Sequence, residues 1–477
     1  MGASILKGKQ FYIFAKNYLR MTLIKSISGI RGTIGGEVGA NLTPLDIVKF
    51  ASAYGMWLKN NTKGKVKVVV GRDARISGAI VQDLVQSSLL ALGIDVIDLG
   101  LSTTPTVEVA VPLEAANGGI ILTASHNPKQ WNALKLLNDK GEFVSGQDGA
   151  DILEIADNEA FNFVEVDHLG TASKKDYLQI HIDAVLALST VNVSLVKAAN
   201  FKVVIDAVNS TGGIYIPALL RQMGVDVVEL YCVPNGKFPH NPEPLPEHLH
   251  DLCSLVKESK ADLGFVVDPD VDRLAIVAED GTLFGEEYTL VAVADHVLKT
   301  KTGATVSNLS STRALKDVSD KHGVPYHASA VGEVNVVAKM KEVNAPIGGE
   351  GNGGIIYPEL HYGRDSLVGV ALFLTHLAAS KLTCSALRST YTNYYMSKQK
   401  IQLTPNVDVD KILNKMAAKY ASEGVNRIDG VKINFANEWV HLRKSNTEPI
   451  IRVYTESTSA AKANELAQRF INEISLI

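Results

Sequence analysis

A serine followed by a histidine stands where an apolar run of the sequence gives way to a loop. The run at residues 120–122 is followed by Thr-Ala-Ser-His-Asn-Pro at residues 123–128. Apolar residues that stop at small, polar and turn-forming ones are typical of a buried strand followed by a loop. Pro128 lacks an N–H and disfavours helix at the residue before it, so the loop is held open after Ser125. A hydroxyl beside the His126 imidazole is suited to act as a nucleophile or phosphoryl carrier, while a polar turn capped by Ser125 is the alternative.

Three aspartates alternate with other residues between two further apolar runs. The sequence Asp-Pro-Asp-Val-Asp-Arg begins at Asp268. Alternate residues of an extended segment point to one side, so Asp268, Asp270 and Asp272 are expected to form one acidic face. Such carboxylates repel one another unless a cation or strong donors neutralise them, and Mg²⁺ suits hard oxygen ligands. An EF-hand is excluded because Arg273 replaces the required glycine and strands flank the loop, which leaves an acidic surface turn as the alternative.

Two more loops contain residues suited to bind a sugar and a phosphate. Five glycines at 348–354 permit close approach of a ligand, and Glu350 and Asn352 between them can bond hydroxyl groups. A flexible hinge explains this segment equally well. In Arg-Lys-Ser-Asn-Thr-Glu-Pro at 443–449, with Arg452 beyond, two hydroxyls, an amide, a guanidinium and backbone N–H groups form a potential phosphate nest. A solvated basic turn is the alternative there.

A strand–helix–strand pattern occurs three times along the chain and would position these loops. Strands are expected at 66–70, 203–206 and 305–309, each followed by a helix that starts near Ser or Thr and ends at a glycine. Such units are right-handed and make parallel strands. They predict three related α/β domains with mixed sheets, whereas chance recurrence of the pattern in one α/β protein is the alternative.

The C-terminal part of the chain has a different pattern. Alternating apolar residues at 431–435, 439–443 and 450–455 predict half-buried antiparallel strands, and residues 459–474 predict a helix that packs on them. We therefore expect a C-terminal α+β domain. Polar or turn-like stretches divide the chain into an expected N-terminal extension at 1–20 and four domains at 21–171, 172–283, 284–396 and 397–477.

Composition limits the class of protein. The chain has 477 residues, of which 46% are hydrophobic and 21% charged, as in globular proteins with large cores. The net charge of −4 gives no basic footprint for nucleic acid, and no apolar run approaches the ~20 residues that cross a bilayer. Three widely separated cysteines favour a reducing compartment, so we expect a cytoplasmic protein without nucleic-acid or membrane partners. The apolar part of residues 1–20 is short and interrupted, unlike a secretory signal, so we expect an upstream start codon, with an amphipathic arm as the alternative.

Taken in order, the four loops resemble those of the α-D-phosphohexomutase superfamily. Two further segments fit, Ser-Gly-Ile-Arg-Gly at 28–32 and Gly-Arg-Asp-Ala-Arg at 71–75, so that the resemblance extends from Met21 to the C-terminus. The resemblance implies a heart-shaped arrangement of four domains around a central cleft. It also implies interconversion of a hexose 6-phosphate and its 1-phosphate through a phosphoserine enzyme, with a hexose 1,6-bisphosphate as intermediate and activator.

The resemblance further implies roles for individual residues. Those that would transfer the phosphoryl group, surround it or move protons are Ser125, His126, Lys135, Arg31 and Arg72. Those that would hold one Mg²⁺ per chain are Ser125, Asp268, Asp270 and Asp272. Those that would bind the substrate are Arg273, Glu333, Glu350, Asn352, Arg443, Ser445, Asn446, Thr447 and Arg452. Burial of Lys135 near Mg²⁺ would lower its pKa and make it a base near neutral pH, with His126 as the other candidate.

Departures from the commoner family pattern favour one branch. Asn352 and Gly354 stand where bacterial phosphoglucosamine mutases usually have serine and histidine, and Val-Gly-Glu-Val-Asn-Val at 331–336 is similar to the archaeal type. That branch acts on phosphoglucosamine, phosphomannose or phosphoglucose. We expect a phosphoglucosamine mutase, with a phosphomannomutase or phosphoglucomutase as the alternative and a catalytically inactive sugar-phosphate-binding protein as a third hypothesis. Either a monomer or a homodimer is compatible with the sequence.

Overall fold

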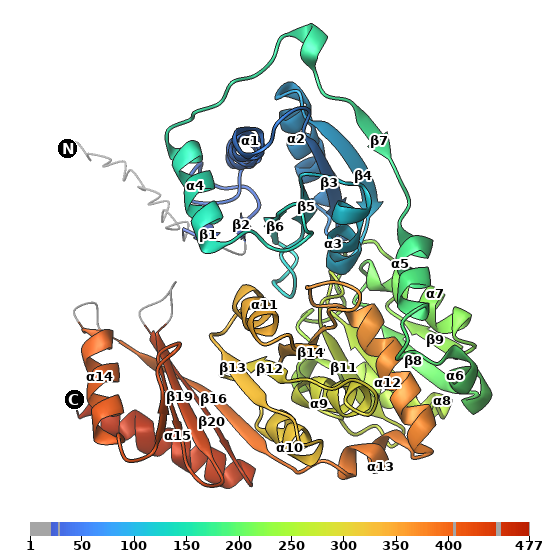
Figure 1. Ribbon diagram of the computed structural model, residues 1–477, viewed down its shortest axis with the longest axis vertical. Helices are drawn as coiled ribbons and strands as arrows, with labels where there is room; N and C mark the ends of the chain where they lie inside the picture. Colours follow the sequence, from blue (N-terminus) through green and yellow to red (C-terminus); the bar gives the residue numbers. More distant parts are fainter. Residues whose placement is uncertain (1–20, 27–28, 404–406, 445–449, 477) are drawn as a thin grey trace, which may run out of the picture.

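The computed structural model describes residues 21–26, 29–403, 407–444 and 450–476. Four sheets follow one another along the chain and form an arc, with the first sheet at one end and the fourth at the other (Figure 1). The first three sheets mix parallel and antiparallel strands, whereas the fourth is antiparallel throughout. The expected fold class, three α/β domains followed by an α+β domain, is confirmed. The expected extension at 1–20 lies outside the described residues.

The first sheet has seven strands in the order β1-β2-β6-β5-β3-β4-β7. They are β1 Ile24–Ser26, β2 Gly29–Thr33, β3 Lys67–Arg72, β4 Asp95–Leu101, β5 Gly118–Leu122, β6 Trp131–Leu137 and β7 Ala172–Lys174. Helices α1 Pro44–Asn61, α2 Gly78–Ala91, α3 Thr104–Leu113 and α4 Gly146–Asp157 flank it. Strands β3 and β5 are parallel, with Arg72 opposite Leu122, so the loops that follow them begin side by side.

The second and third sheets have four strands each, in the orders β11-β10-β8-β9 and β13-β12-β14-β15. The second contains β8 Lys202–Asp206, β9 Asp226–Leu230, β10 Leu263–Val267 and β11 Leu274–Ala278, with helices α5 Leu178–Leu186, α6 Val193–Ala199, α7 Gly212–Gln222 and α8 His250–Ser259. The third contains β12 Thr305–Asn308, β13 Tyr326–Ser329, β14 Ile347–Glu350 and β15 Gly354–Ile356, with α9 Glu286–Val297, α10 Ala314–Lys321, α11 Glu333–Glu342, α12 Ser366–Ser380 and α13 Cys384–Ser389.

The three α/β sheets repeat one arrangement of strands. In each, two strands joined by a helix are parallel, a third strand pairs with the first of them, and a fourth returns antiparallel beside the third. The three predicted repeats are therefore confirmed. The turn between the third and fourth strands occupies the same place in each repeat, at residues 123–130, 268–273 and 351–353. These turns contain, in order, Ser125, the three aspartates and the glycine-rich segment.

The second and third sheets share one hydrophobic core. Helix α12 packs against α5, α6 and α7 beside the second sheet and against α9 beside the third. Phe373 of α12 is fully buried, and its ring centre lies 6.0 Å from that of Phe265 and 5.2 Å from that of Phe284. The expected boundary at 283/284 therefore separates two sheets without separating two cores.

The C-terminal sheet has the order β16-β20-β19-β18-β17. Its elements are β16 Tyr395–Gln402, α14 Val409–Lys419, β17 Gly424–Asn426, β18 Val431–Asn434, β19 Trp439–Lys444, β20 Ile450–Ser457 and α15 Ala460–Ser475. The last three strands and the last helix confirm the sequence prediction. Strand β16 was not predicted, because its sequence Tyr-Met-Ser-Lys-Gln-Lys-Ile-Gln is mostly polar and is ordered by its eight-residue pairing with β20.

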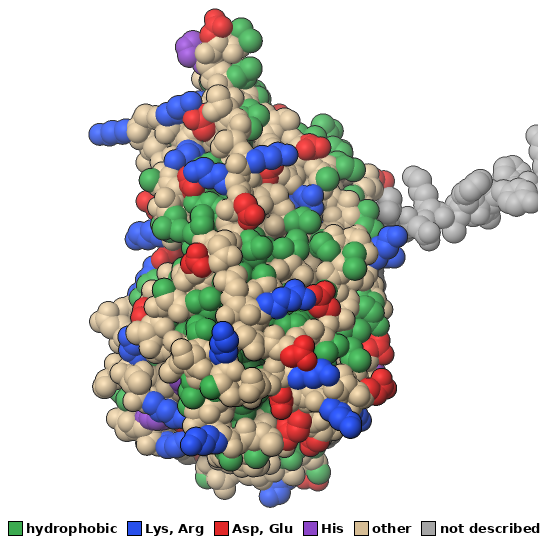
Figure 2. Space-filling model, turned by 90° about the vertical axis from the view of Figure 1, so that its right-hand side faces the viewer, with side chains coloured by type: hydrophobic (Ala, Val, Ile, Leu, Met, Phe, Trp, Pro, Cys, Tyr) green, Lys and Arg blue, Asp and Glu red, His purple; other side chains and the backbone are tan. Residues whose placement is uncertain are grey.

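The outer surface carries both signs of charge. On the face shown in Figure 2, Lys and Arg side chains are interspersed with Asp and Glu side chains and form no continuous basic area. Among the residues that the structure describes, none of the helices has both the length and the apolar character that a membrane span requires.

Replacing Phe373 by alanine should loosen the second and third sheets together. Removing a buried aromatic ring leaves a cavity and costs about 3–5 kcal/mol. We expect faster amide hydrogen exchange in both β10 and α9, measured by mass spectrometry. Phe470→Ala, which removes a buried ring from the C-terminal core, is the matched control and should affect β19 instead. Faster exchange confined to α9 would contradict the shared core.

Candidate active site

The Ser125 hydroxyl lies where the first two of the equivalent turns meet. Ser125 has a left-handed backbone conformation, with φ of +48°, and is 8% exposed. Non-glycine residues adopt this conformation at a cost, and such strained positions cluster at functional sites. Its Oγ donates to Asp268 Oδ2 at 2.8 Å, and His126 Nδ1 lies 3.4 Å from the same Oγ. The structure therefore brings together the serine and the aspartate turn, which are more than a hundred residues apart in sequence.

A fully buried arginine, Arg75, holds the Ser125 turn from behind. Its terminal nitrogens donate to four carbonyl oxygens within residues 125–131, at 2.5–3.0 Å. Its Nε donates to Asp73 Oδ2 at 2.9 Å, which balances the buried charge. Because buried backbone carbonyls outside a sheet need other donors, the guanidinium fixes the backbone of a turn that has no regular structure. Arg75 thereby positions Ser125.

Arg72, which was predicted to lie near a phosphoserine, makes different contacts. Its Nε donates to Gln82 Oε1 at 2.7 Å, and its Nη1 donates to the backbone oxygen of Asp73 at 3.2 Å. The direct contacts with the Ser125 turn come from Arg75 instead. The role of Arg72 beside a phosphoryl group stays a prediction.

The aspartate carboxylates converge, but through a turn and not through an extended segment. Val271, between two of them, has φ of +65°, which folds the backbone back, so the predicted extended geometry was wrong. One ligand oxygen each from Asp268, Asp270 and Asp272 lies within 4.8 Å of the others, and all three residues are fully buried. Oδ1 of Asp270 and Oδ1 of Asp272 have no hydrogen-bond partner. Buried oxygens without donors suit a hard divalent cation, so these residues fit the predicted Mg²⁺ site.

Nearby charges set the protonation of the triad. Burial, together with the carboxylates of Asp272 and Asp270, raises the pKa of Asp268 well above its usual range. At Asp270 burial acts in the same direction, but the Lys135 ammonium, 2.7 Å from Oδ2, lowers the pKa overall. The triad thus contains one carboxyl group that resists ionisation until a cation arrives, and one that is ionised already.

Lys135 is held in the protonated form. Burial would lower its pKa, but the carboxylates of Asp270 and Asp272, at 2.7 and 3.5 Å, raise it above the usual value. In this arrangement attraction to two carboxylates outweighs desolvation. The hypothesis that Lys135 acts as a base beside Mg²⁺ stays a prediction. In the structure Lys135 is a donor that links β6 to the aspartate turn.

Two arginines and a neutral imidazole lie near Ser125. Burial and the neighbouring Arg273 guanidinium lower the pKa of Arg31, whose side chain makes no hydrogen bond or ion pair with any described residue. Arg273 Nε is buried without a hydrogen bond and lies 3.8–3.9 Å from the carboxylates of Asp268 and Asp272. Burial, followed by the charge of Arg273, lowers the pKa of His126 well below its usual value. Free guanidinium N–H groups beside a serine are suited to hold phosphate oxygens.

Arg364 joins the aspartate turn to the glycine-rich turn. Its Nη2 donates to Asp272 Oδ2 at 2.5 Å and its Nη1 to Glu350 Oε2 at 2.9 Å. Its Nε and its backbone N–H both donate to the carboxylate of Glu333, at 3.0 and 2.9 Å. Two predicted sugar-binding residues, Glu333 and Glu350, therefore belong to one network with a predicted metal ligand.

The glycine-rich turn packs directly on the aspartate turn. Gly353 has φ of +85°, and a Cβ there would lie 2.3 Å from the Leu274 carbonyl oxygen, so only glycine fits. Glu350 is buried, and its Oε1 accepts from Asn308 Nδ2 and from a backbone N–H of the loop before α11. Asn352 is half-buried, and its Oδ1 accepts only from its own turn, at 3.3 Å from the Gly354 nitrogen. Asn352 is thus free to bond a ligand, whereas Glu350 is already engaged.

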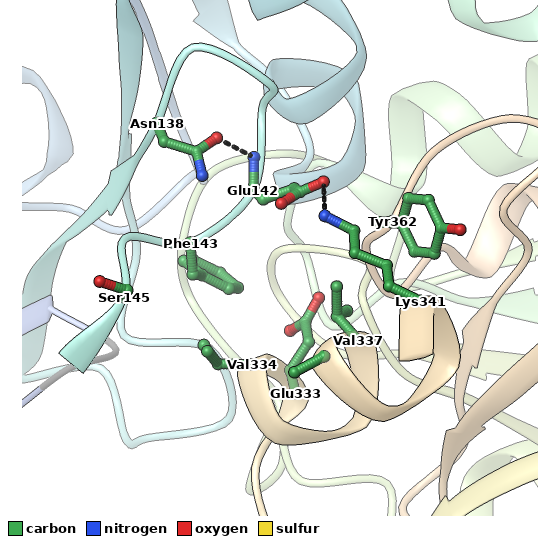
Figure 3. A pocket seen from close by; sticks show the side chains of 10 residues that line it. Asn138, Glu142, Phe143, Ser145, Glu333, Val334, Val337, Lys341 and Tyr362 are labelled. Carbon is green, nitrogen blue, oxygen red and sulfur yellow. Dashed lines mark hydrogen bonds and ion pairs between the residues drawn. The ribbon is translucent and has the colours of Figure 1, made fainter. Parts of the chain in front are cut away.

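Glu333 also faces a small pocket between the first and third parts of the chain. Figure 3 shows its carboxylate directed between Phe143 and Val337, inside a pocket of about 190 Å³. Glu142 of the first part and Lys341 of α11 form an ion pair at 2.5 Å across its edge. The pocket therefore offers a buried carboxylate, an aromatic ring and a cross-domain ion pair.

Two arginines lie side by side at the predicted phosphate loop. Arg443 of β19 is directly opposite Arg452 of β20, and like charges opposite each other destabilise a sheet unless an anion neutralises them. Arg443 Nε pairs with Asp429 Oδ2 at 2.8 Å, whereas Arg452 has no ion pair with any described residue. The pair is suited to bind a phosphate. The other predicted phosphate ligands lie outside the described residues: Ser445, Asn446 and Thr447.

Four segments of the chain match the four domains of one family. Residues 23–163, 179–281 and 285–394 match the alpha/beta/alpha domains I, II and III of phosphoglucomutase/phosphomannomutase, and residues 403–473 match its C-terminal domain. The chain belongs to the phosphoglucomutase/phosphomannomutase family.

Individual relatives cover nearly the whole chain. A phosphoglucomutase/phosphomannomutase from Thermococcus kodakarensis is 35% identical over 92% of this chain and 95% of its own length. A phosphoglucosamine/phosphogalactosamine mutase from Sulfurisphaera tokodaii is 32% identical over 94% of this chain and 97% of its own. The crystal structure of a phosphoglucomutase/phosphomannomutase family protein from Burkholderia thailandensis superposes with a TM-score of 0.82 at 26% identity, covering 95% and 98% of the two chains. The chain is an isomerase of the phosphohexomutase type, as its sequence predicted.

Several contacts of this phosphoglucomutase/phosphomannomutase site were not predicted. Arg75 lies in the Gly-Arg-Asp-Ala-Arg segment that supports the resemblance. Its contacts could not be predicted, because backbone carbonyl oxygens and one carboxylate as partners leave no recognisable pattern in the sequence. Arg364 stands in a short Gly-Arg-Asp segment that was not singled out. Thr104 Oγ1 donates to Asp270 Oδ2 at 2.5 Å, from the start of α3, where the sequence shows only an ordinary helix start. All three act on neighbours distant in sequence.

Replacing Arg75 by lysine should disable the Ser125 turn without unfolding the first sheet. Lysine keeps the charge beside Asp73 but cannot reach four carbonyl oxygens at once. Misplacement of a reacting group by about 1 Å costs on the order of 10²-fold in rate, so we expect kcat/KM for hexose phosphate to fall by about that factor. Arg221→Lys, at an exposed ion pair with Glu229, is the control and should keep its activity. Unchanged kcat/KM in the Arg75 variant would show that the Ser125 turn keeps its conformation without the guanidinium.

Proposed function

We propose that the chain is a phosphoglucosamine mutase, which interconverts glucosamine 6-phosphate and glucosamine 1-phosphate through a phosphorylated Ser125. The observation that carries the proposal is the hydrogen bond of Ser125 Oγ to Asp268 inside a buried aspartate triad. If the three buried carboxylates had only a structural role, two of their oxygens would be left without hydrogen-bond donors. A bound cation accounts for these oxygens. The family to which the chain belongs supports the same reaction type.

The reaction moves a phosphoryl group in two steps. In the first, the bond between phosphorus and Ser125 Oγ breaks while the free sugar hydroxyl attacks, which gives a glucosamine 1,6-bisphosphate. In the second, Ser125 Oγ attacks the other phosphate of that intermediate and becomes phosphorylated again. The intermediate must turn over within the site between the steps. Phosphoryl transfer depends mainly on alignment and on neutralising charge, which Arg31 and Arg273 provide.

The aspartate triad would hold Mg²⁺, with a phosphate oxygen on Ser125 as a further ligand. When bound, this ion supplies positive charge to the phosphoryl oxygens and orients them. Lys135 already compensates part of the negative charge of Asp270 and Asp272, and it would keep both carboxylates in place.

His126 is the better candidate for moving a proton at Ser125. Its Nδ1 lies 3.4 Å from Ser125 Oγ, and its lowered pKa keeps the imidazole neutral and able to accept a proton. Lys135, whose pKa is raised, carries its proton at neutral pH and suits the role of a donor. A correctly placed acid or base contributes about 10²–10⁴-fold.

Glu333 is the residue that favours an amino sugar over a neutral hexose. Arg364 is shared by three carboxylates, and Lys135 is a second cation at Asp272, so one guanidinium serves both Glu333 and Glu350 beside the pocket. An ammonium group at the sugar C2 position would find its counter-charge at Glu333, which points into the pocket (Figure 3). The alternative, a phosphomannomutase or phosphoglucomutase, is favoured by the Thermococcus kodakarensis relative and requires only a hydroxyl partner there.

Replacing Ser125 by alanine should abolish turnover and leave the fold intact. Without the carrier oxygen no phosphoenzyme forms, so kcat should fall by on the order of 10⁴-fold or more. Transfer of ³²P from labelled glucose 1,6-bisphosphate to the protein tests this directly, with the exposed Ser189→Ala variant as the matched control. Labelling of the Ser125 variant, or full mutase activity in it, would exclude this residue as the carrier. Labelling of neither protein would favour an inactive sugar-phosphate-binding protein.

Replacing Glu333 by glutamine should reduce activity on the amino sugar selectively. The loss of a charged hydrogen bond costs about 1.5–3 kcal/mol, so we expect kcat/KM for glucosamine 1-phosphate to fall about 10–100-fold. The values for glucose and mannose 1-phosphates should change much less, with each assay primed by the matching bisphosphate. Glu342→Gln, on the exposed side of the same helix, is the control. Equal losses on all three sugars, or a wild-type preference for mannose phosphate, would support the alternative function.

A further inference from the structure

A second group of possible metal ligands lies at the junction of the first three parts of the chain. His181 comes from α5, and His361 and Asp365 come from the segment between β15 and α12. His181 Nε2 lies 2.9 Å and His361 Nε2 lies 3.2 Å from Asp365 Oδ2. The three candidate ligand atoms lie within 4.8 Å of one another, and none of the side chains is more than 8% exposed. None of the three belongs to the Mg²⁺ site described above.

The other nitrogen of each ring is held from behind. His181 Nδ1 is 2.9 Å from Thr106 Oγ1, which in turn is 2.6 Å from Thr103 Oγ1. His361 Nδ1 lies at an ion-pair distance of 3.3 Å from Glu108 Oε2, although the two atoms do not form a hydrogen bond of good geometry. Histidines that bind metals almost always hydrogen-bond their second nitrogen to a carboxylate, carbonyl or other polar group, which fixes the ring and its tautomer. His181 therefore has the orientation of a metal ligand, and the Nε2 atoms of both rings face the same oxygen, Asp365 Oδ2.

The carboxylate is fixed as well. Asp365 Oδ1 accepts from the backbone N–H groups of Leu367 and Val368, at 2.7 and 3.3 Å, and so caps α12. This leaves Oδ2 as the oxygen that faces the two imidazoles. Because the first backbone N–H groups of α12 already fix one oxygen of this carboxylate, the other oxygen can bind a ligand with little further loss of side-chain entropy.

Glu108 provides an independent indication of a missing cation. It is 1% exposed, and neither of its carboxylate oxygens has a hydrogen bond of good geometry. Among the described residues no lysine or arginine pairs with it, and its ion-pair contact is with His361 Nδ1 at 3.3 Å. Burying a carboxylate without hydrogen-bond donors costs free energy. This cost falls when a metal ion bound to the neighbouring imidazole brings positive charge close to the carboxylate.

We propose that His181, His361 and Asp365 bind a zinc ion that fastens the second domain to the third, beside helix α3 of the first. Two imidazole nitrogens and one carboxylate oxygen are ligands that suit Zn²⁺, with water in the fourth position, whereas Mg²⁺ prefers oxygen ligands alone. The ion replaces the protons that otherwise lie between the ring nitrogens and Asp365, and its two charges balance Asp365 and Glu108. An imidazolium at His361, shared by these two carboxylates, is the competing arrangement.

The position of the site gives it a consequence for the active site. Asp365 directly follows Arg364, the residue that joins Asp272, Glu333 and Glu350. A zinc ion at Asp365 therefore fixes the start of α12 and, with it, the guanidinium that holds the aspartate and glycine-rich turns. The proposal concerns metal binding alone and does not depend on which sugar phosphate the enzyme converts.

Metal analysis of the full chain, purified without a polyhistidine tag, tests the proposal. After incubation with Zn²⁺ and dialysis, mass spectrometry should find one zinc per chain in the wild type and in Asp270→Asn, because the latter alters only the aspartate triad. His181→Gln should reduce the zinc to background. Glu108→Gln, which removes the charge behind His361, should weaken zinc binding about 10–100-fold. His240→Gln, at another His–Asp ion pair in which only the aspartate is fully buried, is the control and should retain zinc.

Two outcomes overturn the proposal. One is a wild-type protein without zinc after this treatment, which identifies the cluster as a hydrogen-bonded imidazolium. The other is loss of zinc in Asp270→Asn with retention in His181→Gln, which places the ion at the aspartate triad. If His181→Gln does not fold, the wild type still decides: Zn²⁺, but not Mg²⁺, should raise the unfolding temperature of metal-free protein. Substituted Co²⁺ should then show the visible absorption of a tetrahedral site, and absence of both effects contradicts the proposal.

Discussion

Buried negative charge is the constraint on which the rest of this structure depends. Asp268, Asp270 and Asp272 lie in one short turn without contact with water, and such charges are stable only with partners. The nearest partners come from elsewhere in the chain. Lys135 reaches the turn from the first sheet, and Arg364 reaches it from the segment before α12. Because each cation belongs to a different domain, neutralising the turn also draws three domains together.

The repeated strand order explains how one such turn comes to face two others. In each α/β sheet the turn between the third and fourth strands follows a buried parallel strand, so it emerges at the carboxyl end of that strand. One repeat contributes a serine at this place, the next an acidic turn, and the third a glycine-rich turn. No single domain contains the serine turn, the aspartate turn and the glycine-rich turn together. The site therefore exists only in the assembled chain, which accords with the core that the second and third sheets share.

Local features of the sequence predicted much of this architecture. The βα repeats, the strands around Ser125 and the aspartates, and the final sheet and helix follow from the spacing of apolar residues, which reports which side of an element is buried. The predicted site residues with described positions gather around the three turns and the C-terminal sheet. Long-range electrostatics and local backbone conformation could not be predicted from these patterns. The pKa of Lys135 rises because of two carboxylates from another domain. Val271 adopts a left-handed backbone conformation, which nothing in the sequence indicates because β-branched residues rarely adopt it.

What the sequence could not indicate is the path that links the C-terminal domain to the acidic turn. Asp429 Oδ2 accepts from Arg443 Nε and from the backbone N–H of Val331, at 2.8 and 3.1 Å. The next N–H along this loop donates to Glu350, whose other oxygen is bound by Arg364. A continuous series of contacts therefore runs from Arg443 of the C-terminal sheet through Asp429 and the loop before α11 to Glu350 and Arg364, and it ends at the aspartate turn. The C-terminal domain is thus joined to the aspartate turn by charged and backbone groups, none of which has a neighbour in sequence that reveals its partner.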